Sequence, residues 1–183
     1  MTNTFGSFQL GSVAKLPNVS VAFRGEHWSD GVAATDIIPG SLVVPTSSAG
    51  ARVWNVASAG TVDPRACIAL RVVSPTDVNP GSEYNPQLTP NDIVNLTLKK
   101  GSFVHTYRSG AFHLTLCAED TYAPGDLLTW DPAATPFAGK AGPGAWKKTV
   151  TAAQAWCEVV GFDALTADAS QGVVLVHSLK SQF

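Results

Sequence analysis

Two similar phrases, each a Pro-Gly turn that leads directly into an apolar strand, constrain the fold of this chain more than any other feature. They occupy residues 38–43 (IPGSLV) and 122–128 (YAPGDLL), and residues 100–104 (KGSFV) form a shorter relative. Proline holds the φ angle that a turn requires, and glycine accepts the positive φ of the following position. The repeated phrase predicts a β protein assembled from similar hairpins.

The composition agrees with a chain of many short strands. The 183 residues include 16 glycines and 12 prolines, which are spread along the chain and favour many turns over long helices. Alternating apolar residues between turn signals predict about ten to twelve short strands and almost no helix. The expected fold is all-β, either a β-barrel or a jelly-roll-like sandwich, with an extended N-terminal arm.

We expect one β domain over residues 31–183, preceded by the arm over residues 1–30. The arm mixes Gly, Ser, Thr and Asn with spaced apolar side chains, and a frayed terminus is the alternative interpretation. The loop at residues 74–90 contains four prolines and is much longer than usual, which indicates a functional or interface-bound segment. The candidate residues for an interface with other subunits are the apolar side chains of these two segments: Phe5, Phe8, Leu10, Leu16, Phe23 and Tyr84.

Low charge is the most informative property of the composition. Only 14% of the residues are charged, against about 25% in an average soluble domain, and the formal net charge is −2. These values favour a subunit of a large assembly and predict no nucleic-acid partner. We also expect no membrane partner, because no apolar run approaches the roughly 20 residues of a spanning helix and the N-terminus lacks the apolar region of a signal peptide.

The three cysteines predict a chain that folds in a cytoplasm. Cys67, Cys117 and Cys157 are odd in number, far apart, and each set among apolar residues typical of a strand. They are interpreted as reduced core residues. No metal ligand is assigned to them, because paired C-x-x-C spacing is missing from the sequence.

Catalytic motifs are also missing from the sequence, so we predict no enzyme, no catalytic residue and no cofactor. The clearest hairpin is expected at residues 103–117 with its turn at 108–110, which would place His105 opposite His113. Such a pair can bind a metal, but no third ligand is evident, and ordinary strand-surface histidines are the alternative.

Two further groups of residues each allow two interpretations. The acidic residues Glu119, Asp120, Asp126 and Asp131 could hold calcium, or they could serve as turn residues whose side chains bond to the backbone. The tryptophans at positions 130, 146 and 156 could form a face that stacks on sugar rings, or they could fill a core or a subunit interface.

The sequels of the two Pro-Gly phrases also resemble each other. Pro39 is followed by Cys67, and Pro124 is followed by Cys157 after a similar length of chain. A turn, a strand, a variable loop and a returning strand recur in the same order. Divergent internal duplication is one explanation, and the repetition inherent in any β-barrel is the other.

Residues 38–43 and 124–128 (PGDLL) resemble the small capsid cement, or head decoration, proteins of tailed bacteriophages. The similarity is a loose pattern over residues 36–178. It includes an Ala-rich strand at 67–70, a glycine-bearing strand at 159–165 and a closing valine strand at 173–176. The segment 1–30 and the 74–90 loop depart from the family's pattern.

The resemblance implies a barrel or jelly-roll-like protein that oligomerises as a dimer or trimer. It implies a structural virion protein, made in the host bacterial cytoplasm, that binds the major capsid protein on the outer surface of the phage head and stabilises the lattice. A β-sandwich adhesin on the head or tail that binds glycans is the alternative. An enzyme built around His105, His113 and the acids of residues 119–131 is a third hypothesis.

Overall fold

The structure is a computed structural model that describes residues 19–48, 51–71, 96–114, 116–118, 120–136, 144–161 and 174–179. These residues form nine strands and one short 3-10 helix, Ala152–Gln154. The strands are β1 Val19–Ala33, β2 Leu42–Ser48, β3 Ala51–Val56, β4 Cys67–Leu70, β5 Phe103–Leu114, β6 Leu127–Asp131, β7 Ala145–Lys148, β8 Cys157–Gly161 and β9 Val174–Ser178. The prediction of an all-β fold is confirmed. Among the described residues, no helix has the length and apolarity needed to cross a bilayer.

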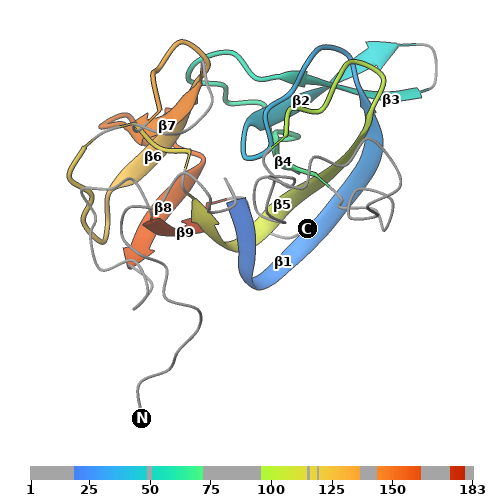
Figure 1. The fold of residues 1–183 in the computed structure, drawn as a ribbon. Coiled ribbons are helices and arrows are strands. Elements are labelled where there is room, and N and C mark those ends of the chain that lie inside the picture. Colours follow the sequence, from blue (N-terminus) through green and yellow to red (C-terminus); the bar gives the residue numbers. More distant parts are fainter. Residues whose placement is uncertain are drawn as a thin grey trace, which may run out of the picture.

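Strands β1 to β5 close into a five-stranded barrel, which we call the first barrel (Figure 1). The strand order is β1-β3-β2-β4-β5, and β5 pairs back onto β1. Only the β1–β3 pair of this ring is parallel. One cluster of buried residues fills the barrel: Ala33, Ile37, Val43, Trp54, Cys67, Ala69, Leu98 and Val104.

Strands β6 to β9 form the second sheet. The order β9-β8-β6-β7 continues from β5, which therefore belongs to both halves of the molecule. Residues 116–118 run parallel to β7, because Trp146 N donates to Leu116 O at 2.9 Å and Ala118 N donates to Trp146 O at 2.8 Å. The second sheet thus curls back toward the strand from which it started.

The three glycine-launched strands begin with the same backbone turn. In each, the glycine N–H donates to a carbonyl of a neighbouring segment, and the residue after the glycine accepts from the N–H of that same neighbour. The neighbours are Ala69 for Gly40 (2.7 and 3.0 Å), Ala33 for Gly101 (2.8 and 2.9 Å) and Val159 for Gly125 (2.8 and 2.8 Å). The glycines have φ of 92°, 85° and 93°, as the sequence phrase predicts.

The similarity of the two halves extends to individual strand pairings. Strand β2 lies between β3 and β4, as β6 lies between β7 and β8. Val43 pairs with Cys67, and Leu128, at the same distance from its turn, pairs with Cys157. Two residues further along each central strand, the partners are Trp54 and Trp146. Repetition of strands alone does not require equal registers, so the structure favours internal duplication.

The predicted hairpin at residues 103–117 is wrong. Strand β5 continues through Arg108, Ser109 and Gly110 without a turn. The reason is tertiary pairing: β1 follows β5 along its whole length, and Glu26 pairs with Ser109 where the turn was expected. Four register shifts along the β1–β5 pair accommodate its curvature (Figure 1).

The structure describes only part of the predicted arm and none of the predicted 74–90 loop. The second part of the predicted arm, residues 19–30, belongs to β1, whereas residues 1–18 lie outside the described residues. Leu98 forms an isolated bridge with Ile37. The 74–90 loop lies outside the described residues.

Candidate functional site

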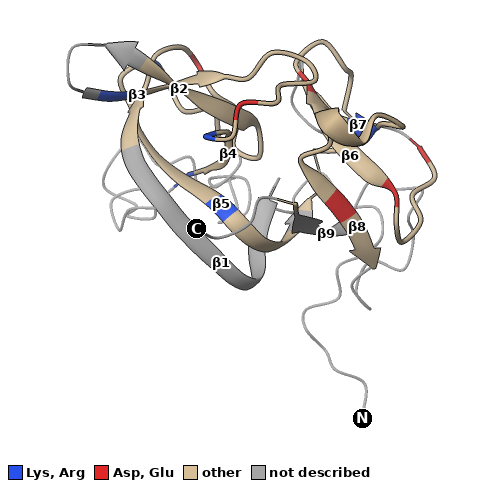
Figure 2. Ribbon diagram, turned by 180° about the vertical axis from the view of Figure 1, so that it is seen from behind, with Lys and Arg blue, Asp and Glu red and all other residues tan. Residues whose placement is uncertain are grey.

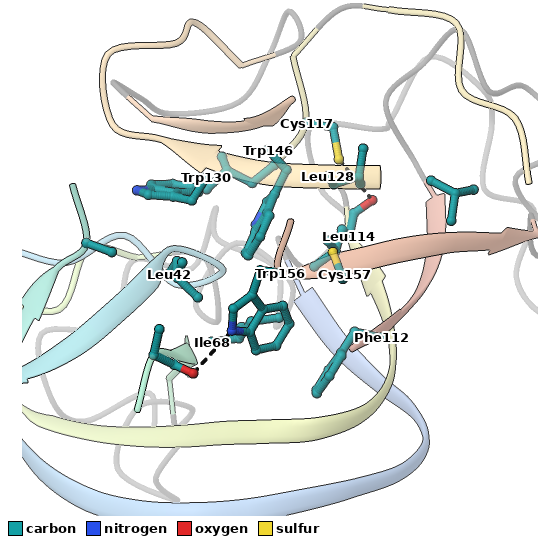
Figure 3. Packing of buried hydrophobic residues seen from close by; sticks show 14 of the residues in the cluster. Leu42, Ile68, Phe112, Leu114, Cys117, Leu128, Trp130, Trp146, Trp156 and Cys157 are labelled. Atoms are coloured by element: carbon teal, nitrogen blue, oxygen red, sulfur yellow. Dashed lines mark hydrogen bonds between the residues drawn. The ribbon is translucent and has the colours of Figure 1, made fainter. Parts of the chain in front are cut away.

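Three tryptophans pack between the first barrel and the second sheet (Figure 3). The ring of Trp146 lies 5.6 Å from that of Trp130 and 5.6 Å from that of Trp156, measured between centroids. Each of the three is at most 1% exposed. They cannot stack on a sugar, so the glycan-binding interpretation of these tryptophans is wrong and the core interpretation is correct.

Two indole N–H groups fasten the halves of the molecule together. Trp146 Nε1 donates to Gly40 O in the first Pro-Gly turn at 2.8 Å. Trp156 Nε1 donates to Ala66 O, just before β4, at 3.2 Å (Figure 3). Both acceptors belong to the first barrel, so these two hydrogen bonds connect the second sheet to the barrel. We call Trp130, Trp146 and Trp156 the tryptophan joint.

The three cysteines are buried, which confirms that they are core residues, and none of them forms a disulfide within the described part of the chain. Burial raises the pKa of the Cys67 thiol from 9.0 to about 12, although Arg108 and a hydrogen bond with Thr106 act in the opposite direction. Burial also raises the pKa of Cys157 well above its usual range. The nucleophilic thiolate is therefore disfavoured at both positions.

The continuous course of β5 through residues 108–110 separates the two histidines of the predicted pair. His105 has Asp30 and Leu70 as its strand partners, and His113 has Ser20 and Leu175. Eight residues of extended strand span about 26 Å, which is too far for one metal ion. Among the described residues, no group of three His, Cys, Asp or Glu side chains is placed to hold a metal.

The acidic residues act in turns and ion pairs. Asp126 accepts from Ala123 N at 2.7 Å and pairs with Lys148 at 2.9 Å. Asp131 accepts from Ala133 N at 2.9 Å and pairs with Lys147. In each case the hydrogen bond from the lysine is the main reason that the carboxyl pKa is lowered. The turn interpretation is correct for Asp126 and Asp131.

The described surface exposes several large apolar side chains instead of a polar cluster. Val150 is fully exposed, Phe103 is 62% exposed and Val62 is 61% exposed. Leu96, Val160 and Leu179 complete the set. No sequence signal distinguished these residues, because a single exposed valine in a loop has the same local pattern as a buried one.

Most of the candidate interface residues named from the sequence lie outside the described residues: Phe5, Phe8, Leu10, Leu16 and Tyr84. Glu119, from the acidic group, also lies outside them. Phe23 lies in β1, where it pairs with Ala111. The structure therefore brings none of them together in a described site.

No family model matches the chain, and no curated protein matches it.

Proposed function

We propose that the chain is a structural virion protein that binds the outer surface of a phage head and stabilises the capsid lattice. Its partners are the major capsid protein and further copies of itself in a dimer or trimer. The observation that carries the proposal is a pair of joined β units that exposes large apolar side chains, Val62, Phe103 and Val150 among them. A contiguous exposed apolar patch is typical of a surface that binds other proteins, and the proposal takes Val62 and Val150 to belong to such a patch.

The charge distribution supports the same role. Lys147 and Lys148 are each paired with an aspartate, and Figure 2 shows the charged residues dispersed over both halves of the molecule. Binding alone would supply the function: each contact contributes modestly, and the symmetry of the shell multiplies it into a large cost for pulling capsid subunits apart.

The proposal includes the finer expectations from the sequence. The complete fold has ten to twelve strands. The part of the predicted arm that precedes β1, residues 1–18, and the 74–90 loop contribute Phe5, Phe8, Leu10, Leu16 and Tyr84 to the interface, and Phe23 joins them from β1. A variant that lacks residues 1–18 leaves β1 intact and should bind heads more weakly without unfolding.

The test is the copy number of the chain relative to the major shell protein in gradient-purified particles, measured by quantitative mass spectrometry. A protein that covers the lattice should be present in the hundreds per particle, because symmetry repeats one interface over the shell. About a dozen copies would move the chain to a vertex or tail. Its absence from particles would refute the virion role.

A further inference from the structure

Equivalent loops of the two halves lie side by side. The β3–β4 loop contains residues 57–66, the β7–β8 loop contains residues 149–156, and Figure 1 shows the first reaching across to the second. Their contact is close, because a Cβ atom at Gly60 would lie 3.1 Å from Cδ of Gln154. Gly60 N also donates to Trp130 O at 3.2 Å. We call residues 58–62 and 149–154 the loop platform.

The loop platform is uncharged and tipped with apolar groups. Residues 58–62 (SAGTV) and 149–154 (TVTAAQ) contain no Asp, Glu, Lys or Arg. Val150 is fully exposed and Val62 is 61% exposed, and Ala59, Ala152 and Ala153 in the same two loops are also exposed. At the border, Arg65 is neutralised by Asp63 at 2.9 Å.

The platform is also held in shape by its own backbone. Thr61 N donates to Ser58 O at 3.2 Å, Gln154 N to Thr151 O at 2.9 Å and Ala155 N to Ala152 O at 3.1 Å. The tryptophan joint lies beneath both loops, since Trp156 ends one loop and bonds to Ala66 at the end of the other. A preformed surface loses little conformational entropy when it binds.

We infer that the loop platform docks on the shell in addition to the arm, and that its partner there is an uncharged, apolar surface of the shell protein. The inference rests on the proposed function and names the contact through which it operates. The centre of a protein interface is depleted in charge, as this platform is. Nucleic acid or an anionic membrane would instead require Lys or Arg, which the platform lacks.

The experiment uses particles of the encoding virus that were produced without the chain, and measures co-sedimentation of added purified protein. Val150→Asp and Val150→Lys should each weaken binding by about tenfold or more, because either charge would be desolvated against an apolar partner. Val150 is fully exposed, so neither change disturbs the core. Thr135→Asp changes an exposed side chain of similar shape between β6 and β7, outside the set of exposed apolar residues; it is the matched control and should change binding by less than about twofold.

The outcomes separate the platform from the function. If the unaltered protein does not bind the particles, the proposed function fails and the platform with it. If it binds and both Val150 variants bind equally well, only the platform is refuted. If one charge weakens binding and the other strengthens it, the partner surface is charged and the inference of an apolar partner is wrong.

Discussion

The buried indole N–H groups allow the hydrogen bonds of the tryptophan joint to be tested residue by residue. Trp156 Nε1 bonds to Ala66 O, whereas Trp130 Nε1 is buried and has no hydrogen-bond partner among the described residues. Trp156→Phe should therefore lower the free energy of unfolding by about 1–2 kcal/mol more than Trp130→Phe, since only the first change leaves a carbonyl unpaired. Urea denaturation of both variants measures the difference. Equal losses would mean that the hydrogen bond to Ala66 contributes nothing.

The buried thiols predict the behaviour of the protein in alkali. The folded-state pKa of Cys67 is about 12, against 9.0 for an ordinary thiol, so the unfolded chain releases its proton first. The protonated Cys67 thiol makes its full contribution to the free energy of unfolding below pH 9. This contribution is lost as the pH rises from 9 toward 12. Urea midpoints at about pH 7 and about pH 10.5 should differ less for Cys67→Ala than for the unaltered protein. Tyr122, whose pKa is also raised by burial, keeps some pH dependence in the variant.

Among the structural elements, the Pro-Gly turn before β6 isolates the cost of backbone conformation. Gly125 has φ of 93°, and a Cβ there would have no atom within 4 Å. Gly125→Ala should destabilise the fold by about 1–2 kcal/mol through the positive φ alone. Gly125→Asn is the control and should cost less, because asparagine tolerates this region better. Thermal unfolding measures both, and an alanine variant as stable as the asparagine variant would contradict the turn geometry.

The same elements show how far local sequence reaches. The turns at Gly40, Gly101 and Gly125 were predictable because proline and glycine determine φ within a few residues. The continuation of the strand through residues 108–110 was not predictable, because their turn signal is overridden by pairing with β1, about 80 residues earlier in the chain. The exposure of Val62 and Val150 likewise depends on how two distant loops meet. Local chemistry predicted the fold class, whereas the candidate docking surface required the tertiary arrangement.

On the scale of the whole molecule, the two halves are unequal despite their similar pairings. The cluster inside the first barrel contains only residues of that half. The cluster of the second sheet includes Leu42, Ala57, Ala66 and Ile68 from the outer face of the first barrel. The position equivalent to Ile68 in the second sheet is Glu158, which is only partly buried. The outer face of the first barrel therefore completes the core of the second sheet, whereas the cluster inside the first barrel includes no described residue of the second sheet.

This asymmetry predicts the order in which the molecule opens. Val43→Ala and Val159→Ala remove the same two methyl groups from fully buried sites, one in each cluster, and each should cost about 2 kcal/mol. In native-state hydrogen exchange, Val159→Ala should lower the protection of β6–β8 and leave β2–β4 protected. Val43→Ala should lower the protection of both β2–β4 and β6–β8, because the second sheet has no complete core without the first barrel. Equal loss in both halves for Val159→Ala would show a single cooperative unit, in which the shared strand β5 transmits unfolding in both directions.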